Sequence, residues 1–141
     1  MNVGEQFALE LGRVNRQWRK RLDERLKHTG LTQARWLVLL HLSRAGPLSQ
    51  RELAEIVGIE GPTLVRMLDS LEGQGLVERR VGEEDRRVRQ VHLAEAARPL
   101  LAEITSIAAA LRRELLAEVA DGELRAAWKV LKDIADRLES L

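Results

Sequence analysis

The side chains best suited to chemistry in this sequence are arginines gathered in and around one short polar loop. Asp85, Arg86 and Arg87 lie in this loop. Three further arginines flank it: Arg79, Arg80 and Arg89. A guanidinium fork suits phosphate groups and base edges, and an arginine at a hairpin tip fits a narrow minor groove of DNA. We expect Asp85 to hold a neighbouring arginine by a charge-assisted hydrogen bond, because a carboxylate does not contact phosphate favourably. On composition alone, a solvated charged loop explains these residues better.

A second group of polar residues lies on the outward face of a predicted helix that begins at Gly61-Pro62. Three leucines recur at helical spacing and mark its buried face: Leu64, Leu68 and Leu71. The outward residues are Pro62, Thr63, Arg66, Asp69 and Ser70. Thr63 can meet a thymine methyl group or a polar base edge, and Arg66 can reach guanine or a phosphate. The alternative is a plain helical hairpin with a solvated polar face.

A shorter predicted helix over residues 50–57 precedes this one, and the pair has the order of a helix-turn-helix. Ser49 and Glu52 form an S-x-x-E capping box at its start. The Gly-containing segment 58–61 joins the two helices, as the motif requires. In such a motif the second helix enters the major groove with its N-terminal residues. Two strand-like runs, 76–81 and 88–93, enclose the arginine loop and predict a β-hairpin.

The remaining segments are predicted to be helical, which makes the chain mainly α with a small β-hairpin. The predicted helices run over residues 5–28, from an N-cap at Thr32 to Gly46, over residues 95–119, and onward from a cap at Asp121. This pattern is typical of a winged helix-turn-helix with additional terminal helices. We expect residues 31–94 to form the DNA-binding domain, and residues 1–30 and 95–141 to form a helical dimerisation region.

The terminal helices carry wide apolar stripes that have no role in a lone winged helix. These stripes include Trp18, Trp128, Leu131 and Leu138. A monomer of 141 residues could hardly bury them all, and exposed apolar stripes of this size imply an interface. We therefore expect a homodimer, which would place two recognition helices about one turn of DNA apart, roughly 34–36 Å. A six-helix monomer with a good core is the alternative.

Composition and motifs argue against an enzyme, a metalloprotein or a membrane protein. The chain has no cysteine, and its histidines at 28, 41 and 92 are too scattered for a metal site. The sequence contains no H-E-x-x-H, P-loop or dinucleotide motif, so we expect no cofactor. No apolar run approaches the ~20 residues of a transmembrane helix, and the first residues lack a signal-peptide pattern. A cytoplasmic protein is therefore expected. The net charge is only +1, so nucleic-acid binding must be argued from local motifs.

The sequence from Leu31 to Leu93 resembles the MarR family of bacterial transcription regulators, and its SlyA-like branch in particular. The most specific motifs are L-x-x-L-E-x-x-G-L-V-x-R, from Leu68 to Arg79, and D-x-R, from Asp85 to Arg87. The resemblance implies a homodimer on pseudo-palindromic promoter DNA, with Arg66 reading the groove and Arg86 at the wing tip. Together with the helix face, it gives these DNA-binding residues: Pro62, Thr63, Arg66, Ser70, Asp85, Arg86 and Arg87.

The same resemblance implies an effector, because many MarR-like regulators release DNA when small aromatic acids bind. Arg16, Arg19 and Trp36 match a ligand site of the SlyA-like branch in type, and Trp18 lies beside the two arginines on the first predicted helix. An arginine beside an indole suits an anionic aromatic ligand through charge and stacking. In the alternative, the two tryptophans belong to the core and the protein is a constitutive DNA-binding dimer. A winged helix that binds protein is a further alternative, although such domains lack groove-facing arginines.

Overall fold

The computed structural model describes residues 1–82 and 84–141, most of which are helical. The elements in chain order are α1 (Val3–Leu26), η1 (Lys27–Thr29), α2 (Gln33–Ala45), β1 (Leu48–Ser49), α3 (Gln50–Val57), α4 (Gly61–Gly73), β2 (Val77–Val81), β3 (Arg89–Leu93), α5 (Ala97–Leu116) and α6 (Asp121–Glu139). The predicted fold class, a winged helix-turn-helix with terminal helices, is confirmed. The chain divides into two compact units, Met1–Ala108 and Ala109–Leu141.

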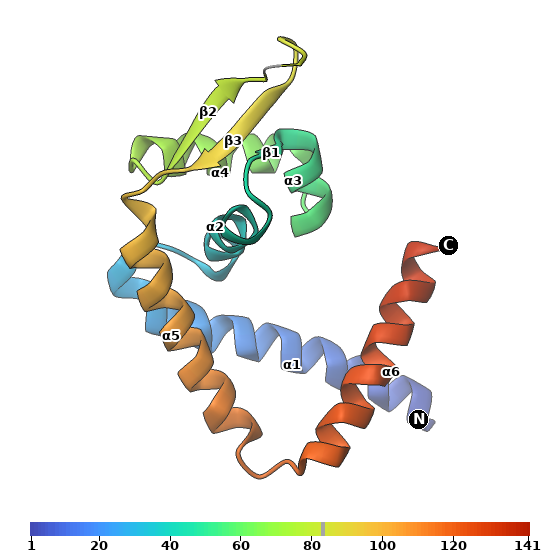
Figure 1. The fold of residues 1–141 in the computed structure, drawn as a ribbon. Helices are drawn as coiled ribbons and strands as arrows, with labels where there is room; N and C mark the ends of the chain where they lie inside the picture. The colour runs from blue at the N-terminus through green and yellow to red at the C-terminus, as the bar shows by residue number, and fades with distance from the viewer. Residues whose placement is uncertain (83) are drawn as a thin grey trace. The chain divides into compact units, whose positions relative to one another are not determined.

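The wing of the first unit is a three-stranded antiparallel sheet in the order β1-β3-β2. The sequence predicted only the hairpin of β2 and β3, in which Val77 pairs with Leu93 and Val81 with Arg89. The third strand is short, and its Leu48 pairs with Val91 of β3. A strand of two residues is too short to show an alternating pattern, which is why periodicity did not reveal it. Figure 1 shows the hairpin projecting from the helices of this unit.

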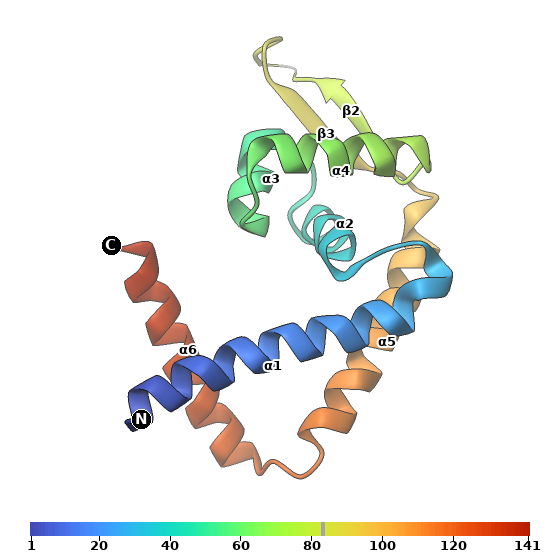
Figure 2. The ribbon, with the colours of Figure 1, turned by 180° about the vertical axis from the view of Figure 1, so that it is seen from behind.

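A core of leucines holds α2, α3 and α4 together beneath the sheet. Leu53 of α3 and Leu68 and Leu71 of α4 are fully buried. Val77 and Val91 bring β2 and β3 into the same core. Because one stripe of α4 faces this core, its opposite face is left for solvent or a partner. Figure 2, which views the molecule from behind, shows α4 running across the foot of the hairpin.

The predicted capping residues occupy their expected places, with one exception. The Ser49 hydroxyl accepts the Glu52 N–H at 3.0 Å, and the Glu52 carboxylate accepts the Ser49 N–H at 3.0 Å. Thr32 caps α2 by accepting the Arg35 N–H at 3.3 Å. The expected cap at Asp121 was wrong by one residue, because Ala120 is the N-cap of α6. Asp121 instead lies in the first turn, where its negative charge interacts favourably with the positive end of the helix dipole.

Two side-chain contacts, one from α1 and one from η1, attach this segment to the rest of the first unit. The Asp23 carboxylate accepts the backbone N–H of Gln33 at 2.6 Å, at the start of α2. His28 Nε2 lies 2.9 Å from a Glu103 carboxylate oxygen of α5. Leu22 and Leu26, on the same side of α1, are buried. The N-terminal half of this helix, in contrast, exposes Phe7, Leu9, Leu11 and Val14.

The second unit consists of the end of α5, a short connection and α6. Apolar side chains of α6 are exposed, with Trp128 at 61% and Leu138 at 65% of their full accessibility. Leu131, on the same helix, is also exposed. The helix is amphipathic, so these residues form an uncovered apolar stripe. None of the helices described here has both the length and the apolar character needed to cross a bilayer.

Candidate nucleic-acid interface

The outward face of α4 presents the predicted recognition residues. Pro62 and Arg66 are exposed, whereas Thr63 and Ser70 are half-buried. One Nη of Arg66 donates to the Thr63 hydroxyl at 3.4 Å, which directs the guanidinium toward the N-terminal turn of the helix. Pro62 lies in that first turn, where its missing N–H removes no helical hydrogen bond. The face therefore combines a long cationic donor with short polar and apolar groups, the types that read base edges.

In the wing loop, one of the two arginines is held by hydrogen bonds and the other is exposed. The Asp85 carboxylate accepts the backbone N–H of Arg87 at 3.0 Å and its Nε at 3.3 Å. These two hydrogen bonds, the backbone one above all, lower the pKa of Asp85 below its usual value. Arg86 is exposed and forms no hydrogen bond or ion pair with any described residue. The expectation that Asp85 holds an arginine thus matches the geometry, and the arginine held is Arg87.

Gly82 closes the wing loop at a point where no side chain fits. Its N–H donates to the Val88 carbonyl at 2.8 Å, and the Val88 N–H donates to the Asp85 carbonyl at 3.1 Å. A Cβ added at Gly82 would lie 3.0 Å from the Asp85 carbonyl oxygen and 3.1 Å from that of Val88. Both neighbours are backbone atoms and cannot rotate away. Sequence reasoning missed this role, and the only sequence feature that pointed to it was a glycine directly after a strand.

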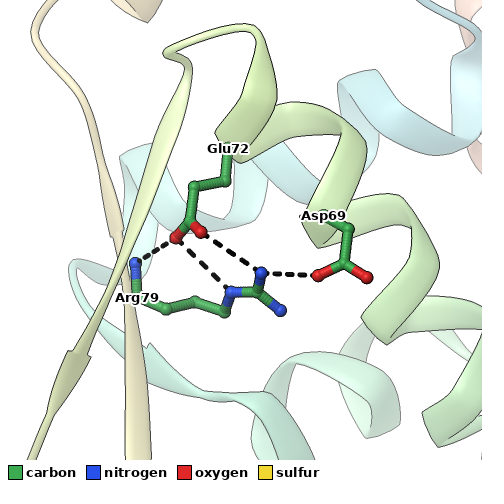
Figure 3. Close-up of polar contacts among 3 residues, drawn as sticks. All are labelled: Asp69, Glu72 and Arg79. Atoms are coloured by element: carbon green, nitrogen blue, oxygen red, sulfur yellow. Dashed lines mark hydrogen bonds and ion pairs between the residues drawn. The ribbon is translucent and has the colours of Figure 1, made fainter.

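A half-buried arginine joins the recognition helix to the wing (Figure 3). Arg79 of β2 donates from one Nη to Asp69 at 2.5 Å and to Glu72 at 3.2 Å. The backbone N–H of Arg79 also donates to Glu72 at 3.0 Å. The Arg79 side chain is only 13% exposed. In the sequence, Arg79 is only one of several arginines that flank the loop, and its position does not connect it to either carboxylate. We call these three residues the Arg79 clamp.

The contacts of the Arg79 clamp shift the pKa of Glu72 and the pKa of Arg79. Hydrogen bonds from the Arg79 side chain, and then from its backbone, hold the pKa of Glu72 below its usual value. Hydrogen bonds to Glu72 and Asp69 raise the pKa of Arg79 further above its already high value. The ionised forms of Glu72 and Arg79 thus stabilise each other. The arrangement keeps α4 and β2 in a fixed relation at neutral pH.

The four residues predicted to hold an effector occupy different surroundings. Arg16 and Arg19 line a shallow depression of about 530 Å³ along α1 and η1. The other lining residues are Lys20, Asp23, Glu24 and Lys27. Trp36 is buried, and its indole N–H has no hydrogen-bond partner among the described residues. Trp18 is half-buried. Neither tryptophan lines this depression, so the structure brings together the two arginines but does not join them to the indoles.

Known proteins share both the sequence pattern and the architecture of this chain. A sequence model of the MarR family matches residues 29–88, a range that runs from α2 through β2 to the end of the wing loop. The solved structure of the transcriptional regulator PA3341 is 48% identical in sequence, covers 96% of this chain and 99% of that chain, and superposes with a TM-score of 0.87. The chain belongs to the MarR family. It is therefore a DNA-binding transcriptional regulator and not an enzyme.

Other MarR-family structures share the fold at lower identity. AbsC, a MarR family transcriptional regulator from Streptomyces coelicolor, is 26% identical, with 100% of this chain and 98% of that chain covered and a TM-score of 0.89. A mutant of MarR from E. coli, solved in complex with operator DNA, is 23% identical, with 95% and 99% covered and a TM-score of 0.84. At this last level of identity, the likeness concerns the fold alone.

Proposed function

We propose that this MarR-family chain acts as a homodimer that binds pseudo-palindromic promoter DNA through α4 and the wing. The observation that carries the proposal is that Arg66 and Arg86 are both exposed, on two elements that the Arg79 clamp joins. In this function α4 lies in the major groove and the wing tip reaches the minor groove. The proposed DNA-binding residues are Pro62, Thr63, Arg66, Ser70, Asp85, Arg86 and Arg87.

The exposed apolar side chains of the terminal helices support the homodimer. Phe7 and Leu11 on α1, and Trp128, Leu131 and Leu138 on α6, are all more than 40% exposed. Apolar residues exposed in this number on amphipathic helices mark an interaction surface. We propose that residues 1–30 and 95–141 form the dimer and that residues 31–94 contact DNA. Twofold symmetry of the dimer would then match the symmetry of the operator.

A mobility-shift titration tests DNA binding directly. Purified wild-type protein is titrated against the DNA upstream of its own gene and against a shuffled fragment, each at about 50 and 200 mM salt. We expect a discrete complex with the upstream DNA that weakens steeply as salt rises, because phosphate contacts release counterions. Equal and weak binding to both fragments would contradict specific promoter recognition.

For the effector, we propose a small aromatic carboxylate, and within the family we place the chain in the SlyA-like branch. One observation supports the branch and another supports the effector. The segment 58–72 and the wing motif Asp85 to Arg87 resemble that branch, and Arg16 and Arg19 lie together at one depression. A ligand releases DNA only if it binds the non-DNA conformation more tightly, and couplings of this kind are typically about 5–150-fold in affinity.

Salicylate serves as the probe for the effector proposal. At millimolar concentration it should weaken operator binding by at least a few-fold. Arg16→Ala should reduce that response while leaving ligand-free DNA binding nearly intact. Arg44→Ala, which removes an exposed arginine of α2 outside the depression, is the matched control. If salicylate changes neither the melting temperature nor the DNA affinity, the protein is a constitutive regulator with respect to this class of ligand.

A further inference from the structure

We propose that Arg79 is a positioning residue for DNA binding, because it holds the Asp69 carboxylate and thereby leaves the Arg66 guanidinium available to DNA. The inference rests on the proposed function, in which Arg66 contacts the groove. Arg79 itself is too enclosed to serve as a DNA contact, since its side chain is only 13% exposed and its guanidinium is bonded to two carboxylates. Its effect on DNA binding is therefore exerted through Asp69.

Asp69 and Arg66 are three residues apart on α4, the spacing at which side chains on a helix meet. Elsewhere in this chain, oppositely charged side chains at that spacing do form ion pairs. Such pairs join Glu10 to Arg13, Arg21 to Glu24, and Glu95 to Arg98. Between Asp69 and Arg66 no such pair is present in the described structure. The Asp69 carboxylate bonds to Arg79, and Arg66 turns toward Thr63 instead.

Glu72 explains why Arg79 can hold Asp69 securely. Its carboxylate accepts hydrogen bonds from the backbone N–H and from the guanidinium of Arg79, so the arginine is fixed at both its backbone and its guanidinium. An ion pair with an enclosed, multiply bonded guanidinium is favoured over one between two freely moving exposed side chains, which gains little in water. Asp69 therefore stays with Arg79 and does not transfer to Arg66.

Loss of Arg79 would affect DNA binding in two ways that act in the same direction. The released Asp69 carboxylate, 59% exposed, would pair with Arg66 and compete with DNA for it. Whenever it is not paired with Arg66, it would stand unneutralised on the helix face that approaches the phosphates, where negative charge is repelled. Both effects need the Asp69 carboxylate. A purely structural role of Arg79 would not depend on Asp69 in this way.

The test is a double-mutant cycle on the full-length protein, with DNA affinity read by fluorescence anisotropy on the upstream fragment. Arg79→Gln should weaken binding by about tenfold, within the range for losing one arginine–base contact. Adding Asp69→Asn to that variant should restore affinity to within about threefold of wild type, because the competing carboxylate is gone. Asp69→Asn alone should leave affinity within about threefold of wild type, because Glu72 still holds Arg79.

Two outcomes would overturn the proposal. One is an absence of rescue in the double variant, which would show that Arg79 acts only through the fold. The other is a fall of about one in the salt slope that persists in the double variant, which would mean that Arg79 contacts a phosphate itself. If Arg79→Gln does not fold, Arg79→Lys with and without Asp69→Asn replaces it, with a smaller loss and the same rescue expected. A wild-type protein that binds no DNA would contradict the proposed function instead.

Discussion

The arginines of the proposed interface differ in their hydrogen-bond and ion-pair partners, and we expect them to differ in their roles for the same reason. Arg79 is clamped by two carboxylates and Arg87 is bonded to Asp85, whereas Arg86 reaches outward without a described partner. An arginine that is already neutralised contributes little to the attraction of phosphate, because its counterion is part of the protein. The free arginines, Arg66 and Arg86, should therefore contribute most of the DNA affinity and do so in different ways.

Arg66→Ala should cost about 1–3 kcal/mol in affinity for the upstream DNA if the arginine reads a base. Sequence preference should relax at one position in each half-site. Competition with a set of fragments that vary each position of the site measures both effects. A uniform loss of affinity on every fragment would mean that Arg66 contacts only phosphate.

Arg86→Ala should weaken binding to every DNA fragment by a similar factor, because a wing arginine meets backbone and minor groove. The salt slope of log K should fall by about one for one lost phosphate contact. Arg51→Ala is a matched control, since Arg51 is an exposed arginine of α3 that pairs with Glu55 and lies outside the proposed interface. Unchanged affinity of Arg86→Ala at both salt concentrations would remove the wing from the mechanism.

At the scale of elements, the start of α3 depends on the reciprocal capping box of Ser49 and Glu52. Hydrogen bonds from Ser49, the backbone one first, lower the pKa of Glu52 below its usual 4.5. A lowered pKa in the folded state means that the ionised form stabilises the fold above pH 4.5. That contribution is lost as the pH falls through the lowered value. The capping box thus links the first helix of the DNA-binding motif to acid stability.

Ser49→Ala should lower the free energy of unfolding at pH 7 by about 1 kcal/mol, the usual effect of losing such a cap. Ser43→Ala, at an exposed position within α2, is the control and should have a much smaller effect. Glu52→Gln keeps a capping side chain that does not titrate. Its stability should fall less steeply than that of wild type below pH 4.5 in urea denaturation at several pH values. Parallel pH curves for the two proteins would contradict this account.

Local features of the sequence were enough to predict most of the elements but not the contacts between them. Ser49, Thr32 and the buried leucines act through neighbours within one or two turns, so their spacing alone reveals them. Strand β1 and the Arg79 clamp join segments that only the folded chain brings together. For the same reason, spacing could not show that Trp18 and Trp36 stay outside the depression lined by Arg16 and Arg19. Sequence patterns identify the apolar and polar faces of each helix or strand, and tertiary packing determines which of these faces contact one another.

At the scale of the whole molecule, the exposed apolar stripe of α6 is the feature that most needs a partner. Leu131→Glu combined with Leu138→Glu should convert the proposed dimer into a monomer, because charges would be buried without partners in the interface. Specific operator binding should then be lost, since one half-site supplies too little binding energy. Sedimentation velocity measures the oligomeric state, and Lys132→Glu on the same helix is the charge control. A dimer that survives the double substitution would contradict the proposed interface.

Ser49 belongs to two elements at once, and this limits how the length of the chain can vary. It pairs with Gln90 as the last residue of β1, and it caps α3 through its hydroxyl. An insertion between Leu48 and Ser49 would separate the paired strand residue from the helix cap, so the strand register and the start of α3 could not both be kept. Among the described residues of the wing loop beyond Val81, none both pairs within a strand and caps a helix. Across related proteins, we therefore expect changes of length to accumulate in the wing loop and to be rare at the junction of β1 and α3.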